Sequence, residues 1–295
     1  MRNMRAFLPS LVSLLLSATA LAGTGATVAT DNVKARLLSE NASIAPGSTF
    51  TVALELDIRD GWHTYWRNPG DSGQATRLKW TLPPLFLDSD IQWTTPHRFD
   101  VPPLVNYGYA HHAMHLVDIR APKELKPGEV ALAATANWLV CSDIFIPESA
   151  DLQLTVPVGD GAKDPAVAAQ FDAARADLPK PAPGTASAEL KGQELQLTLN
   201  GDWGEVLQHA DDVSFFPFAE GSIEYAAPQR MVRDGQAVKL ALKVGYAPPK
   251  SGPVEGVIVL AQGKGAGSSR LPLTLSAPLA VSPAAGAAAA APRFA

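Results

Sequence analysis

The strongest constraint on the fold of this chain is a hydrophobic pattern with a period of two. From Thr49 to Ile58, apolar and polar side chains alternate, which is typical of a strand buried on one face. The same pattern recurs in the segments 130–138, 152–158, 195–199, 238–244, 254–260 and 271–275. The 25 prolines and 23 glycines suit the turns between such segments. We therefore predict a mostly β protein made of antiparallel sandwiches.

One segment between the two groups of strands has helical periodicity instead. Asp164 and Pro165 are typical of a helix start, and apolar residues at helical spacing continue to Leu178. Residues 179–185 are rich in proline and suit a linker. We predict a first β-sandwich domain over 23–160, a helix and linker over 161–185, and a second β-sandwich domain over 186–279. The Ala-rich segment 280–295 is expected to be disordered.

The first residues predict export. Arg2 and Arg5 precede a short apolar run, and Ala20-Leu21-Ala22 suits signal-peptide cleavage, so we expect a signal peptide over 1–22 and a periplasmic location. No later apolar run is long enough to span a bilayer. The chain has 24 Lys and Arg against 29 Asp and Glu and lacks a basic stripe, which argues against a nucleic-acid partner.

The chain contains one cysteine, Cys141. It has no second thiol with which to form a disulfide inside this chain. The thiol is therefore either buried and inert or available for a bond to another molecule, including a Cys141-linked dimer.

Several motifs give the chain a family resemblance. The segment Gly61-Trp62-His63-Thr64-Tyr65-Trp66-Arg67-Asn68-Pro69-Gly70-Asp71-Ser72-Gly73 is followed by Asn106-Tyr107-Gly108-Tyr109, then by Trp138-Leu139-Val140-Cys141 and Ile146-Pro147-Glu148. In this order they resemble the N-terminal periplasmic domain of the DsbD/ScsB thiol:disulfide interchange proteins. The resemblance extends over residues 33 to 279.

The resemblance implies immunoglobulin-like sandwich domains and a function in electron transfer. Family members carry two cysteines that pass electrons between a membrane reductase module and periplasmic thiol-disulfide proteins. A loop caps the cysteine pair, and its equivalent here is the segment 102–109. The expected site therefore comprises Cys141 and the cap and partner-binding residues, which are Asn106, Tyr107, Gly108, Tyr109 and Phe145. A membrane module would be encoded separately.

The chain departs from the family pattern at Phe145, which stands where the second cysteine is expected. Release of a reduced partner needs a second, resolving thiol, so a complete catalytic cycle is doubtful. Two functions stay open. Cys141 exchanges electrons or forms a mixed disulfide with partners, or the chain is a non-catalytic binding module in which Cys141 is structural. Neither requires a cofactor.

Two other features of the sequence, a histidine group and the tryptophans, are candidate binding sites. His111 and His115 would lie about 13 Å apart on one strand face, too far to share a metal ion, so a solvated strand is the better interpretation and we expect no metal. Most tryptophans suit core packing. Trp66 and Arg67, beside the turn at Asn68-Pro69-Gly70, are the best candidates for exposed ligand contacts.

Overall fold

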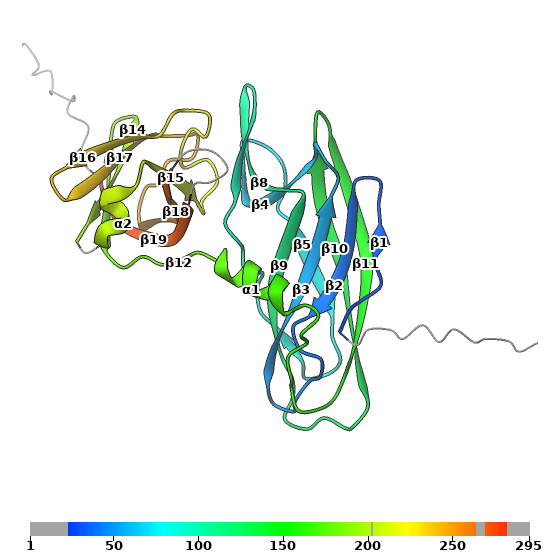
Figure 1. Cartoon of the computed structure of the whole chain (residues 1–295). Coiled ribbons are helices and arrows are strands. Elements are labelled where there is room, and N and C mark those ends of the chain that lie inside the picture. Colours follow the sequence, from blue (N-terminus) through cyan, green and yellow to red (C-terminus); the bar gives the residue numbers. More distant parts are fainter. Residues whose placement is uncertain (1–22, 202, 264–268, 282–295) are drawn as a thin grey trace, which may run out of the picture.

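The computed structural model describes residues 23–201, 203–263 and 269–281. Three β-sheets and two short helices make up this part of the chain (Figure 1). The prediction of a mostly β protein is confirmed. The predicted signal peptide lies outside the described residues, as do residues 282–295 of the predicted disordered tail. No helix among the described residues is long and apolar enough to cross a membrane.

Two sheets from the N-terminal part face each other. The first has the order β1 (Val28–Ala29), β2 (Val33–Ser39), β3 (Thr49–Ile58), β9 (His112–Arg120), β6 (Leu87–Asp88). The second has the order β11 (Phe145–Pro157), β10 (Glu129–Cys141), β4 (His63–Gly70), β8 (Leu104–Ala110), β7 (His97–Val101), and β5 (Arg77–Thr81) also pairs with β10. All strand pairs in these two sheets are antiparallel, as predicted.

The alternating segments form the core between these sheets. Leu54 and Leu56 of β3 are completely buried, and Leu132 of β10 and Val156 of β11 meet them from the opposite sheet. Burying a large aliphatic side chain contributes about 1.5–3 kcal/mol. Burial of these period-two faces therefore fixes the strand registers, because a slip by one residue would turn each apolar face to solvent.

The predicted helix is present but shorter than expected. It is α1 (Ala168–Ala176), and the Asp164 carboxylate accepts a hydrogen bond from the Ala166 N–H just before it. Phe171 is completely buried and packs with Leu38 and Leu116 of the first sheet. Arg175 donates hydrogen bonds to Glu40 and Thr51, which ties the end of the helix to the same sheet.

The C-terminal part forms a single mixed sheet. Its order is β15 (Asp212–Pro217), β18 (Pro253–Gln262), β19 (Ser269–Val281), β13 (Thr185–Lys191), β14 (Glu194–Asn200), β17 (Ala237–Lys243), β16 (Arg230–Asp234). The short strand β12 (Lys180–Pro181) and helix α2 (Gly204–His209) complete it. Three sequence expectations are wrong here: β12 and β13 run parallel to β19, the predicted linker contains β12, and residues 280–281 continue β19 instead of starting a disordered tail.

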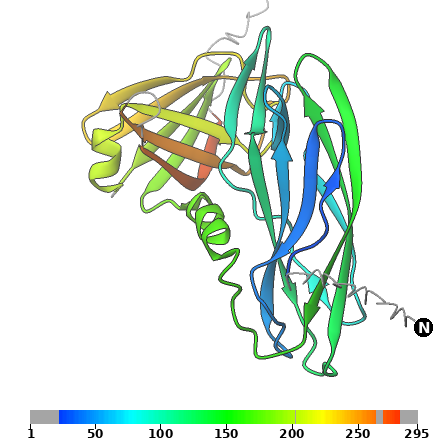
Figure 2. The same ribbon diagram turned by 45° about the vertical axis from the view of Figure 1, so that its right-hand side comes forward.

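The C-terminal sheet packs against one side of the N-terminal sheets, with α1 near the junction (Figure 2). Trp66 of β4 is completely buried and meets the rings of Phe216 and Phe218 at 6.4 and 5.9 Å. Asn68 donates a hydrogen bond of 2.8 Å to the Pro217 carbonyl and accepts one from the Tyr225 hydroxyl. The expectation that Trp66 is exposed is therefore wrong. One apolar core runs through both parts.

Candidate functional site

Cys141 is the last residue of β10, beside a three-residue turn that leads into β11. Its strand partners are Phe145 on one side and His63 on the other. The residue is only 2% exposed, and its thiol donates to the Ser142 carbonyl at 3.5 Å. Of the two options that the sequence left open for the thiol, the structure favours a buried one.

Tyr65 covers the thiol from β4. Its side chain is completely buried, and its ring lies 6.5 Å from that of Phe145, in a stacked orientation. Burial and the neighbouring Cys141 sulfur raise the pKa of the Tyr65 hydroxyl far above its ordinary value. The tyrosine is therefore neutral and keeps its proton beside the sulfur. Gly73 packs against the Tyr65 ring so closely that an added Cβ would lie 2.2 Å from a ring carbon.

The predicted cap is a β-hairpin and not a loop. Strands β7 and β8 pair antiparallel, and the tight turn between them contains the cis peptide bond Pro102-Pro103. Phe99 of β7 stacks on the His63 ring, with the centroids 4.6 Å apart and the planes 11° apart. Because His63 pairs directly with Cys141, this stacking connects β7 to the strand that carries the thiol. Phe99 is not among the residues predicted from the sequence, although an aromatic residue shortly before Pro102-Pro103 was a usable signal.

The four predicted cap residues lie in β8 and are buried. Asn106 approaches the His63 ring at 3.5 Å and accepts a hydrogen bond from Ser72, so it joins the cap to the loop after β4. Gly108 lies against the backbone of Thr64, where a Cβ would lie 1.8 Å from the carbonyl oxygen. Tyr107 and Tyr109 point away from the thiol: Tyr107 meets Phe216 and Tyr225, and Tyr109 donates to the Thr94 carbonyl.

The surroundings of the thiol carry little charge. Burial lowers the pKa of His63, which keeps this ring neutral near pH 7. Two other basic side chains contact different groups: His97 contacts Arg270, and Arg67 lies over the Phe218 ring. Glu148 accepts hydrogen bonds from Thr30, Asn32 and Trp138. A cation would stabilise a thiolate, and none of these neighbours supplies one.

Two apolar side chains are exposed at the rim of this site. Ile144 is 61% exposed and Phe145 is 48% exposed, and both belong to the turn region that follows Cys141. An exposed apolar pair beside a buried thiol can serve as a contact for another protein.

The histidine cluster does not form a metal site in the structure. His111 pairs with Asp60, and His112 pairs with Glu55. His115 is completely buried, so the expectation of a solvated strand is wrong for this residue. Within the described residues, no group of three or more His, Cys, Asp or Glu side chains is placed to hold a metal ion.

A known family matches the stretch of the chain that contains Cys141 and its flanking strands. The profile of the family described as "Thiol:disulfide interchange protein DsbD, N-terminal" matches residues 34–157. This stretch belongs to the DsbD N-terminal family. The match ends with β11, so it covers both N-terminal sheets, the cap hairpin and Cys141. No curated protein sequence matches the chain.

A solved structure extends the similarity beyond the matched stretch. The N-terminal periplasmic domain of ScsB from Proteus mirabilis has a TM-score of 0.62 and 17% identity, and the match covers 86% of this chain and 98% of that one. A Porphyromonas gingivalis W83 protein of unknown function and the E. coli chaperone DraB each share 12% identity, at TM-scores of 0.21 and 0.22. They cover 81% and 83% of this chain and 99% and 97% of their own chains. At 17% identity, the similarity to the ScsB domain shows the fold of this chain alone.

Proposed function

We propose that this chain is a periplasmic protein-docking module with immunoglobulin-like sandwich domains that has lost two-electron thiol–disulfide exchange. The observation that carries the proposal is the direct pairing of Cys141 with Phe145 across the β10–β11 turn. The family resemblance puts the second cysteine at this position. Phe145 therefore occupies the place of the resolving thiol.

The pairing geometry explains why this one replacement matters. Residues directly opposite each other in antiparallel strands have Cα atoms about 4.5–5.5 Å apart, which falls in the range that a disulfide requires. Thiol–disulfide exchange needs a second thiol to resolve the mixed disulfide and release the partner. Cys141 is the chain's only cysteine, so the chain supplies no such thiol.

The surface around Phe145, the position of the second cysteine in the family, supports docking. Ile144 and Phe145 are exposed beside Cys141 and would contact an incoming protein before the buried thiol could. The partners that fit this surface are periplasmic thiol-disulfide proteins or a membrane reductase module. Asn106, which holds the hairpin to the loop after β4, is a positioning residue for this surface.

A second candidate function keeps Cys141 reactive. In this alternative the thiol forms one mixed disulfide with a partner, or a Cys141-linked dimer. The Tyr65 hydroxyl favours it, because a neutral phenol beside the sulfur can donate a hydrogen bond to a thiolate. Burial of Cys141 and the neutral His63 ring oppose it.

The variant Phe145→Cys is expected to form a disulfide with Cys141. Both thiols should then resist alkylation in the denatured protein until a reductant is added, and the mass should fall by two hydrogen atoms. In the wild type, acid-quenched and alkylated in cells, Cys141 should be a free thiol that reacts only after denaturation. Non-reducing gels and mass spectrometry measure both results.

Two controls separate the candidate functions. Phe145→Cys in a Cys141→Ser background keeps one thiol and should show no loss of mass. A wild-type band of higher mass that disappears with reductant and in Cys141→Ser would contradict the docking proposal and favour interchange through Cys141. Two free thiols in oxidised Phe145→Cys would contradict the proposed pairing geometry.

A further inference from the structure

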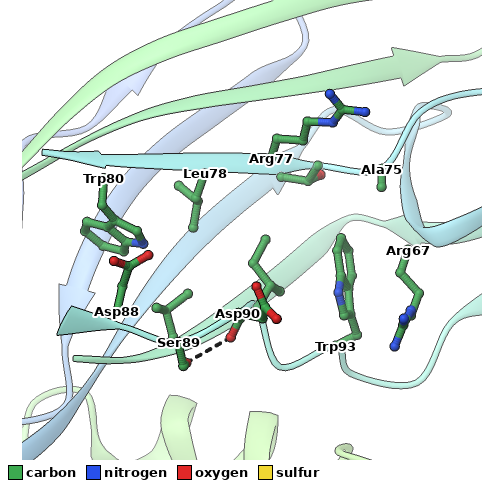
Figure 3. A pocket seen from close by; sticks show the side chains of 12 residues that line it. Arg67, Ala75, Arg77, Leu78, Trp80, Asp88, Ser89, Asp90 and Trp93 are labelled. Atoms are coloured by element: carbon green, nitrogen blue, oxygen red, sulfur yellow. Dashed lines mark hydrogen bonds between the residues drawn. The ribbon is translucent and has the colours of Figure 1, made fainter. Parts of the chain in front are cut away.

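A groove opens where the two N-terminal sheets separate, along β5 and β6 (Figure 3). It encloses about 510 Å³ and shares no residue with the Cys141 site. Its apolar lining consists of Leu78 and Trp80 from β5 and of Ile91 and Trp93 from the segment after β6. All four side chains are only partly buried, so their apolar surface is open to a ligand.

The groove lies along an open sheet edge. Strand β5 pairs only with β10, and the pairing extends from Arg77 to Thr81. In the described part of the chain, no backbone hydrogen bond joins the outer side of β5 to another segment. An edge strand of this kind offers alternate N–H and C=O groups to an added strand. Leu78 and Trp80, two residues apart, point to the same face, which is the groove side.

Charged side chains of opposite sign lie at the two ends of the groove. Arg67 lies at the Trp93 end, and Asp88 lies beside Trp80 at the other end (Figure 3). Arg77 and Asp90 also line the groove. None of these four makes an ion pair within the described residues. A ligand with an acidic group near Arg67 and a basic group near Asp88 would match this arrangement.

The groove continues at the Arg67 end into a cleft between the two β parts of the molecule, lined by Leu178, Pro179 and Phe218. Arg67, Ile91 and Trp93 line both the groove and the cleft. An extended apolar ligand could therefore run from the groove to the junction.

We propose that this groove binds an extended peptide segment of a partner protein, which adds to β5 as a new edge strand. The backbone of the segment hydrogen-bonds to β5, and every second side chain enters the groove between Trp80 and Trp93. The segment carries apolar residues at alternate positions, an acidic residue toward Arg67 and a basic residue toward Asp88. The free backbone groups along β5 favour a peptide over a glycan, which would need polar contacts around the tryptophans.

The proposal is tested with synthetic peptides of this alternating pattern, with Glu at one end and Lys at the other, in both chain directions. Titration into the full chain should change the tryptophan fluorescence in a saturable way for one direction. Hydrogen exchange of the β5 amides should slow in the same complex. The same peptide N-methylated at alternate residues should lose binding, because it can no longer pair with the strand edge.

Variants of exposed residues provide a second test of the proposal. Asp88→Lys should weaken binding of the matching peptide by about tenfold, and a peptide whose terminal Lys is replaced by Glu should recover it. Lys239→Gln, on the C-terminal sheet, should leave binding unchanged. Equal binding of the N-methylated peptide, unchanged β5 exchange, or no binding in either direction would overturn the proposal. Saturable binding of a glucan oligosaccharide instead of the peptides would also overturn it. A dimer in analytical ultracentrifugation, formed by pairing of β5 with a second copy of the chain, would do the same.

Discussion

Replacing Trp66 with alanine is expected to destabilise the protein by about 3–5 kcal/mol, the usual cost of removing a large buried aromatic side chain. The indole is completely buried and contacts Phe216 and Phe218 of the C-terminal part. Its loss leaves a cavity where the two β parts meet. The substitution should therefore lower the free energy of unfolding and weaken the attachment of the C-terminal sheet.

Urea unfolding measures the global effect, and limited proteolysis measures the attachment. Trp66→Phe keeps a ring at the junction and should cost distinctly less than Trp66→Ala. Tyr246→Ala serves as the control, since Tyr246 is 78% exposed and its removal should change stability by at most about 0.5 kcal/mol. A loss below about 1 kcal/mol in Trp66→Ala would contradict the role of Trp66 as the junction anchor.

The position of Trp66 could not be predicted from alternation along the strand. Seven of the eight residues of β4 are buried, and only Arg67 is exposed. A period-two pattern reports burial of one face, whereas both faces of β4 are buried: Tyr65 packs against Phe145 and Gly73, and Trp66 packs against aromatic rings of the C-terminal part. The sequence therefore predicted strands such as β3 and β10 well. It placed Trp66 wrongly because the second covering layer comes from residues about 150 positions away, which local patterns do not reveal.

The cap illustrates a different limit. Pro102-Pro103 is typical of a connection between strands, but proline alone does not distinguish a long loop from a tight turn within a hairpin. The structure uses the pair as a tight turn, so residues on both sides belong to strands. Phe99 reaches His63 only because β7 pairs with β8 and β8 pairs with β4. Such a contact depends on the order of strands in the sheet, which one sequence does not fix.

The family could be recognised from the sequence. The motif around Cys141 and the order of the other motifs indicated it, and the family profile matches residues 34–157. The family resemblance placed Phe145 at the position of the second cysteine, and the structure pairs this residue with Cys141 across one hairpin. Burial of the thiol was not predictable, because Tyr65 and the cap come from distant segments.

Lowering the pH from 7 to 5 is expected to reduce the stability of the folded chain by about 2 kcal/mol through His115 alone. His115 is completely buried between the rings of Trp93 and Tyr109, and neither ring nitrogen has a hydrogen-bond partner. Burial lowers its pKa from 6.5 to about 4. In the unfolded chain the ring takes up a proton below about pH 6.5, so its contribution is present at pH 7 and is lost as the pH falls toward 4.

The variant His115→Phe removes this titration and keeps a ring between Trp93 and Tyr109. Urea unfolding at pH 7 and pH 5 should therefore give a smaller loss for the variant than for the wild type, by about 2 kcal/mol. His111→Gln is the matched control, because its side chain is 76% exposed and its removal should leave the pH dependence of stability almost unchanged. Burial also lowers the pKa values of His63 and His97, so a weaker pH dependence should remain in His115→Phe. Equal pH dependence in His115→Phe and the wild type would mean that His115 gains a proton without unfolding, which its lack of polar neighbours opposes.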